Sequence, residues 1–111
     1  MNCDEIVSGL ILEFRRGTRI MEVLAQLSKP MYGNSLVKEL EGKGISIEGN
    51  TLYPLLRRLE SQGLLKSEWE TDDTKPRKYY IITEDGKQVY KKIKAHWEKF
   101  SQSINVLMEE K

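Results

Sequence analysis

The sequence has little of the chemistry that most enzymes and metal sites require. It contains one cysteine, Cys3, and one histidine, His96, far apart in the chain. A single cysteine cannot form an internal disulfide, and these two side chains do not make up the ligand set of a metal site. The sequence also lacks a glycine-rich phosphate-binding motif. We therefore expect no catalysis, no bound metal and no cofactor.

Two further absences concern the location and the charge of the chain. No apolar stretch approaches the roughly 20 residues that a membrane-spanning helix needs. With Asp4 and Glu5 before a broken apolar pattern, the N-terminus does not resemble a secretory signal. We therefore expect a cytoplasmic protein with no membrane partner. The formal net charge is +1, so the strong basic excess typical of nucleic-acid-binding domains is missing as well.

The sequence does contain apolar patterns that predict a series of short amphipathic helices. No proline-, glycine- or serine-rich linker divides residues 1–111, so we expect a single domain. Apolar residues at helical spacing predict an N-terminal helix over residues 1–16, which Gly17 ends. Thr18 is the expected N-cap of a second helix, which stops before Pro30. A third helix begins near Tyr32 and ends at the glycines at positions 42 and 44.

A fourth helix, from about Asn50 to Gln62, has two different faces. At about 100° per residue, one face is apolar and consists of Leu52, Leu55, Leu56 and Leu59. The opposite face is polar and consists of Asn50, Tyr53, Arg57 and Ser61. Gly63 is the expected C-terminal stop. This pattern predicts a helix that buries its leucines and presents the polar face at the surface.

Two strands and a long helix complete the chain. Residues 64–70 alternate in polarity and residues 77–83 are rich in tyrosine and isoleucine, which predicts two antiparallel strands. Residues 71–76 between them have turn chemistry. Thr83 is the expected cap of a helix that runs from residue 84 towards residue 110. Its apolar residues are spaced as in the seam of a coiled coil and are Tyr90, Ile93, Trp97, Phe100, Ile104 and Leu107.

This seam predicts a homodimer. At ~1.5 Å per residue the helix is roughly 40 Å long, more than the core of so small a domain covers. We therefore expect it to pack on a second copy, and we include Ile6 and Leu10 of the N-terminal helix in the same interface. Packing of the seam on the chain's own N-terminal helix is the alternative that the pattern leaves open.

The order of these elements predicts a winged helix-turn-helix. The expected fold is mainly α with a two-stranded β-wing. It divides into an N-terminal helix (1–16), a winged helix-turn-helix DNA-binding region (17–83) and a C-terminal dimerisation helix (84–111). In such folds the second helix of the turn motif enters the major groove of DNA, and the wing reaches the neighbouring backbone.

The residues that the core does not need are of the types that contact double-stranded DNA. Asn50 and Arg57 can hydrogen-bond base edges, while Thr51 and Tyr53 can reach phosphate or a thymine methyl group. The basic residues expected to neutralise phosphates from the wing are Lys75, Arg77 and Lys78. The basic residues form two clusters, Arg57-Arg58 and the group of Lys75, Arg77 and Lys78. A solvated face would explain each cluster if it stood alone, but their positions in the predicted fold favour DNA.

The stretch YGNSLVKELEGKGISIEGNTLYPLLRRLESQGLLKSEWE, followed by PRKYYIITEDGK, resembles the PadR family of bacterial transcriptional regulators. The resemblance runs in order from about Phe14 to Trp97. It implies a dimeric, sequence-specific repressor that binds an inverted-repeat operator and is released by a small-molecule or stress signal. It is closest to the shorter members, in which one long C-terminal helix makes the dimer.

The resemblance also assigns residues. Tyr32 matches the start of the first helix of the turn motif and joins the expected DNA contacts, while Lys78 matches the returning wing strand. Some relatives bind flat aromatic compounds between paired tryptophans at the dimer interface, so Trp97 is the expected effector-binding residue. The alternative is that Trp97 only anchors the dimer. Asn34 departs from the family, in which many members have an aromatic residue there.

One reading from another class stays open. A winged helix can serve as a protein-interaction module whose DNA contacts are unused, and the near-neutral charge of the chain is compatible with that. Such a module would bind its partner with little dependence on salt or on Arg57. A DNA-binding protein that contacts Z phosphates instead loses affinity with a log-log slope of about 0.9Z.

Overall fold

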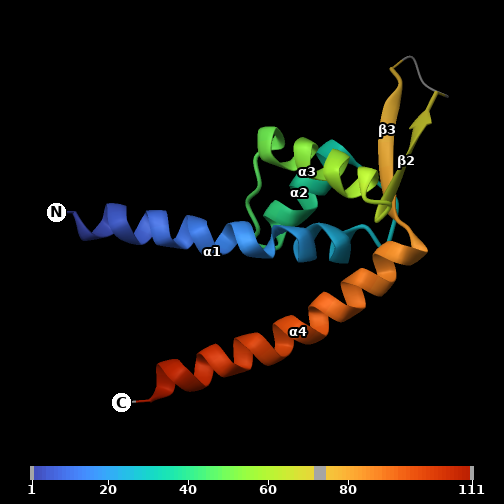
Figure 1. Cartoon of the computed structure of the whole chain (residues 1–111). Coiled ribbons are helices and arrows are strands. Elements are labelled where there is room, and N and C mark those ends of the chain that lie inside the picture. The colour runs from blue at the N-terminus through green and yellow to red at the C-terminus, as the bar shows by residue number, and fades with distance from the viewer. Residues whose placement is uncertain (1, 72–74, 111) are drawn as a thin grey trace.

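The computed structural model describes residues 2–71 and 75–110, which form four helices and a three-stranded sheet. In chain order the elements are α1 (Cys3–Gln26), β1 (Met31–Tyr32), α2 (Gly33–Gly42), α3 (Gly49–Ser61), β2 (Leu65–Glu70), β3 (Arg77–Ile82) and α4 (Glu84–Glu109). Figure 1 shows α2, α3 and the second half of α1 gathered beside the base of the sheet, from which β2 and β3 project as a wing. The predicted mainly α fold with a β-wing is confirmed.

The core consists largely of leucine side chains from three helices and the sheet. The fully buried leucines are Leu24, Leu27, Leu36, Leu52, Leu56, Leu59 and Leu65. Three of them lie on the predicted apolar face of α3. Fully burying one such side chain contributes about 1.5–3 kcal/mol, so the leucines hold α3 on the body by one face and leave the other face free.

Helix α1 differs from the prediction because it is one helix where two were expected. Asn2 caps it, since its side chain accepts a hydrogen bond from the backbone N–H of Asp4 at 3.0 Å. Gly17 lies within the helix, where glycine costs about 1 kcal/mol relative to alanine without breaking the backbone hydrogen bonds. The Thr18 hydroxyl donates back to the carbonyl of Arg15 at 3.1 Å and does not cap a new helix. The predicted break at Gly17 was therefore wrong.

The two helices of the turn motif end at glycines. Gly44 follows α2 with a φ of 86°, and Gly63 follows α3 with a φ of 79°. After Gly63, the N–H of Leu64 donates to the carbonyl of Leu59 at 2.9 Å. This is the bond of a Schellman motif, and the residue after Gly44 makes the equivalent bond to α2. The predicted glycine stops are confirmed.

The sheet has three strands in the order β1-β3-β2, all antiparallel, where two strands were predicted. The added strand, β1, is only two residues long, too short for an alternating pattern to be visible in the sequence. Its Tyr32 pairs with Tyr79 of β3, so the residue that precedes α2 is tied to the wing. The predicted turn between β2 and β3 includes residues 72–74, which lie outside the described residues.

Helix α4 begins at the predicted cap. The Thr83 hydroxyl accepts from the N–H of Gly86 at 3.0 Å and donates to the carbonyl of Gly63 at 2.7 Å. Tyr90 and Ile93 then pack against the core. Beyond them α4 leaves the body, and Figure 1 shows α1 and α4 diverging towards their free ends. Within residues 2–71 and 75–110, no helix is both long and apolar enough to cross a membrane.

Candidate nucleic-acid interface

The polar side of α3 lies at the surface, opposite the leucine core. Asn50, Tyr53 and Arg57 are exposed, and Thr51 is half-buried. The ring of Tyr53 also crosses the start of α2, because a Cβ atom added to Gly33 would lie 2.5 Å from its Cε1 atom. Tyr53 is therefore held by α2 on one side and accessible on the other. We call Asn50, Thr51, Tyr53 and Arg57 the α3 face.

The wing strands carry their side chains on two faces. Trp69 of β2 pairs with Lys78 of β3, and the neighbouring pair is Glu70 with Arg77. Since side chains alternate along a strand and paired residues share a face, these two pairs lie on opposite faces. The face with Lys78 is turned towards α3, because Lys78 forms an ion pair with Glu60 of that helix. We call it the inner wing face and the opposite side the outer wing face.

On the inner wing face, Lys78 lies between α3 and the strands. Its Nζ atom is 3.7 Å from Oε1 of Glu60. It also lies 5.5 Å from the ring centroid of Tyr80 and 5.9 Å from that of Trp69. The hydroxyl of Ser67 donates to the second carboxylate oxygen of Glu60. The sequence-predicted phosphate contact Lys78 is therefore half-buried and held in place by the protein's own side chains.

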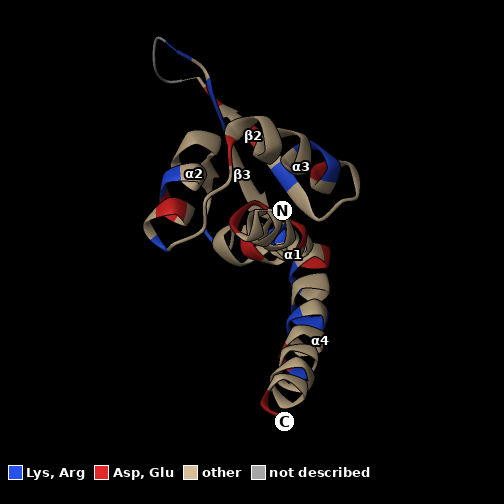
Figure 2. Ribbon diagram, turned by 90° about the vertical axis from the view of Figure 1, so that its left-hand side faces the viewer, with Lys and Arg blue, Asp and Glu red and all other residues tan. Residues whose placement is uncertain are grey.

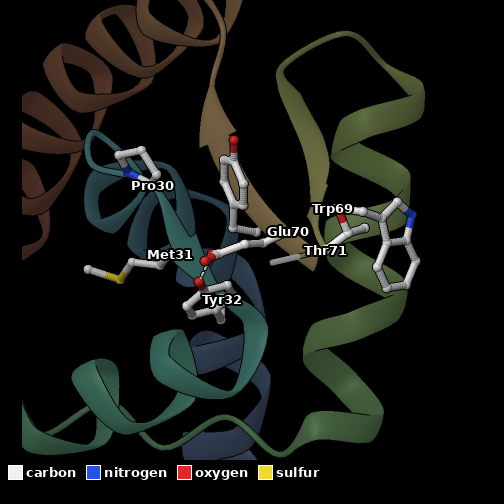
Figure 3. A pocket seen from close by; sticks show the side chains of 7 residues that line it. Pro30, Met31, Tyr32, Trp69, Glu70 and Thr71 are labelled. Atoms are coloured by element: carbon white, nitrogen blue, oxygen red, sulfur yellow. Dashed lines mark hydrogen bonds between the residues drawn. The ribbon is translucent and has the colours of Figure 1, made fainter. Parts of the chain in front are cut away.

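The outer wing face is aromatic and acidic. The Tyr32 hydroxyl donates to the carboxylate of Glu70, and the guanidinium carbon of Arg77 stands 4.2 Å from the Tyr32 ring centroid. Figure 3 shows Tyr32 and Glu70 pointing towards one another at a hollow of about 510 Å³. Tyr79 donates to Glu68 at 2.6 Å, and this hydrogen bond to a carboxylate is the main reason that the pKa of Tyr79 is raised. The predicted DNA contacts Tyr32 and Arg77 thus lie against each other.

The structure brings the eight predicted DNA contacts into two neighbouring groups. The first is the α3 face. The second is the wing, in which Lys75 and Arg77 are exposed while Lys78 and Tyr32 are half-buried. Figure 2 shows Lys and Arg residues both on α3 and along the wing, at the opposite end of the molecule from the C-terminus of α4. Glu60, an acidic residue at the edge of the α3 leucine stripe, could not be predicted as part of this surface, because only the fold reveals that it meets Lys78.

The described residues offer no metal centre. Across residues 2–71 and 75–110, no group of three or more His, Cys, Asp or Glu side chains could hold a metal ion. Cys3 is exposed near the start of α1. His96 is exposed on α4, where it stacks on Phe100 with ring centroids 6.1 Å apart.

The predicted dimer interface lies along α1 and α4. Exposed members are Ile6 (44% accessible), Leu10 (54%), Trp97 (40%), Phe100 (52%) and Leu107 (66%). Ile104 is half-buried, as are Tyr90 and Ile93 at the base of α4. A groove of about 710 Å³ runs between the two helices and is lined by apolar side chains that include Phe14, Met21, Trp97 and Phe100. Packing on the chain's own helices therefore accounts for the base of the predicted seam and leaves much of the rest exposed.

Three comparisons with known proteins point to one family. A family model described as the transcriptional regulator PadR-like family matches residues 20–92. A transcriptional regulator of Mycobacterium tuberculosis is 36% identical over 76 residues, which cover 68% of this chain and 71% of that protein. A crystal structure of a PadR family transcriptional regulator from Eggerthella lenta is 53% identical. The match covers 97% of this chain and 96% of the Eggerthella lenta chain, with a TM-score of 0.92. A PadR-like transcriptional regulator from Bacillus cereus is 25% identical over 89% of this chain and 99% of its own, with a TM-score of 0.80.

Proposed function

Because this chain belongs to the PadR-like family of transcriptional regulators, we propose that it represses transcription as a homodimer bound to an inverted-repeat operator. A small-molecule or stress signal would release it. The family consists of transcriptional regulators, so the sequence prediction that the chain is not an enzyme is confirmed by its membership.

The observation that carries DNA binding is the α3 face. Asn50, Tyr53 and Arg57 are exposed on a helix whose other side is fixed by buried leucines. An amide, a phenol and a guanidinium on a rigid helix are the groups that hydrogen-bond base edges and phosphates in the major groove. The wing beside α3 adds the cations of Lys75, Arg77 and Lys78 for the adjacent backbone.

The exposed apolar surface of α1 and α4 supports a homodimer. Five members of the predicted interface, from Ile6 to Leu107, are each at least 40% accessible in the single chain. Exposed apolar surface on this scale is typical of an interaction site. A second copy would cover it with the same surface, as a two-fold dimer requires. Two copies would also present two α3 faces, which matches the two halves of an inverted repeat.

The groove between α1 and α4 supports an effector site. Its volume of about 710 Å³ lies within the range of small-molecule pockets, and its lining is mostly apolar, with the indole of Trp97 among the lining groups. We propose that a small, flat aromatic effector stacks on Trp97 there. Because the groove lies between the two helices that would form the dimer, its occupant could alter the spacing of the two α3 faces.

The DNA assignment is tested with a matched pair of variants. Arg57→Gln removes one cation from the α3 face, and Lys92→Gln removes one from the exposed surface of α4. Fluorescence anisotropy with a duplex selected from genomic fragments should give an affinity about 5- to 150-fold weaker for Arg57→Gln, since losing a good base contact costs about 1–3 kcal/mol. Lys92→Gln should bind like the wild type. Equal affinities of the two variants would refute the role of the α3 face.

A protein-interaction module is the alternative function. It would retain the leucine core and the apolar surfaces, but the wild-type chain would then show no preference among duplexes and little dependence on salt.

A further inference from the structure

Glu60 connects α3 to both strands of the wing. One carboxylate oxygen accepts the hydrogen bond from Ser67 on β2, and the other pairs with Lys78 on β3. The side chains of Lys78 and Glu60 are only 31% and 33% accessible. Such a partly desolvated pair is screened less by salt than a fully exposed one. One side chain of α3 thus contacts both strands of the wing.

The same contacts hold the Lys78 ammonium while leaving its donors available. Two aromatic rings flank it, with Nζ 5.5 Å from the Tyr80 centroid and 5.9 Å from the Trp69 centroid. The 3.7 Å separation from Glu60 is that of an ion pair and exceeds hydrogen-bonding distance. An ammonium has three N–H donors. Those of Lys78 can therefore bind another anionic oxygen without leaving Glu60.

We propose that Glu60 is a positioning residue for DNA binding, which holds the wing against α3 and keeps Lys78 facing one backbone phosphate. This inference rests on the proposed function. With α3 in the major groove and the wing on the neighbouring backbone, a phosphate strand passes the junction at which Lys78 lies. A lysine that is already held loses less side-chain freedom when it binds that phosphate.

A purely neutralising role for Glu60 predicts the opposite change in DNA affinity from a positioning role. The direction of the change therefore decides between the two roles. If Glu60 only neutralised Lys78, removing the acid would free the cation and strengthen binding, as removing any negative charge near DNA does. If Glu60 positions Lys78, removing it weakens binding even though the protein has become more basic.

The test compares Glu60→Gln, Lys78→Gln and the double variant with the wild type by anisotropy across a salt series. A glutamine at position 60 can still accept from Ser67 but carries no charge for Lys78. We expect either single variant to lose one phosphate contact per protomer. The slope of log affinity against log salt should then fall by about 0.9 per protomer. At 0.1 M salt this corresponds to roughly an eightfold loss of affinity for each contact. The double variant should be no weaker than either single one.

Glu39→Gln is the matched control, since it removes an acid from an exposed ion pair with Lys43 at 3.9 Å on α2. It should keep the wild-type salt slope. Tighter or unchanged binding by Glu60→Gln, or strictly additive losses in the double variant, would overturn the proposal.

A second readout needs no DNA. The chain has two tryptophans, so NMR resolves two indole N–H signals. Glu60→Gln should shift the signal of Trp69, which lies beside Lys78, and leave that of Trp97 in place. An unmoved Trp69 signal would refute the positioning role even where DNA binding is intact. Failure of the wild type to bind any duplex would instead refute the proposed function, and this role with it.

Discussion

Gly86 is the residue at which a single methyl group should do the most damage to the join between α4 and the wing. An alanine Cβ there would lie 2.1 Å from the carbonyl oxygen of Leu64 and 2.6 Å from Cγ1 of Ile82. The carbonyl cannot simply move, because it accepts the N–H of Thr83 at 3.0 Å. Overpacking of this kind costs about 1–3 kcal/mol, and a weakened hydrogen bond adds about 0.5–1.5 kcal/mol. Better helix propensity returns at most about 1 kcal/mol. With the gain in helix propensity subtracted in full, we expect Gly86→Ala to destabilise the fold by about 0.5–3.5 kcal/mol.

The assay is urea denaturation followed by circular dichroism at one fixed protein concentration, because a dimer's stability depends on concentration. Gly42→Ala serves as the control, since a Cβ on this helical glycine meets no atom within 4 Å. The same substitution should there be neutral or stabilising by up to about 1 kcal/mol. A Gly86→Ala variant as stable as Gly42→Ala would contradict the close packing of Gly86 on Leu64 and Ile82.

Two further predictions concern the dimer surface and the outer wing face. Phe100→Glu places a charge on the exposed seam of α4, and analytical ultracentrifugation should then show a monomer in place of the dimer. Gln102→Glu, which lies outside the seam, should leave the dimer intact. A dimeric Phe100→Glu variant would refute the proposed interface. Glu68→Ala should lower the pKa of Tyr79 towards its ordinary value of 10.0, as followed by NMR of the tyrosine ring carbons, because the hydrogen bond to Glu68 is the main cause of the raised pKa. In the wild type this contribution to stability is complete below pH 10 and is lost as the pH rises through the raised pKa; an unchanged Tyr79 titration in the variant would contradict the assigned cause.

The parts of the fold that sequence analysis predicted are those encoded by local periodicity. The leucines of α3 repeat every three to four residues, and Leu52, Leu56 and Leu59 are indeed fully buried. Thr83 marks the start of α4 because its hydroxyl can accept a backbone N–H, and Gly63 marks the end of α3 because glycine readily adopts a positive φ. Both boundaries could therefore be predicted within about two residues.

What the sequence could not reveal depends on tertiary contacts. Gly17 carries a break signal that the continuous helix α1 overrides, because one glycine costs only about 1 kcal/mol. β1 exists only because β3 lies beside it. Likewise, Lys78 was expected only to neutralise DNA phosphates from the wing. The packing of the wing on α3, which brings Glu60 within 3.7 Å, is set by residues far apart in the chain.

The most direct test of the central claim is the affinity of the wild-type protein for duplexes selected from genomic fragments, measured against scrambled duplexes across a salt series. The account predicts that one selected sequence, an inverted repeat, binds at least a thousandfold more tightly than scrambled DNA. Its affinity should fall steeply with salt, with a slope of about 0.9 for each phosphate contact. Equal affinity for every duplex, with no dependence on salt, would contradict the account and leave the winged helix as a protein-interaction module.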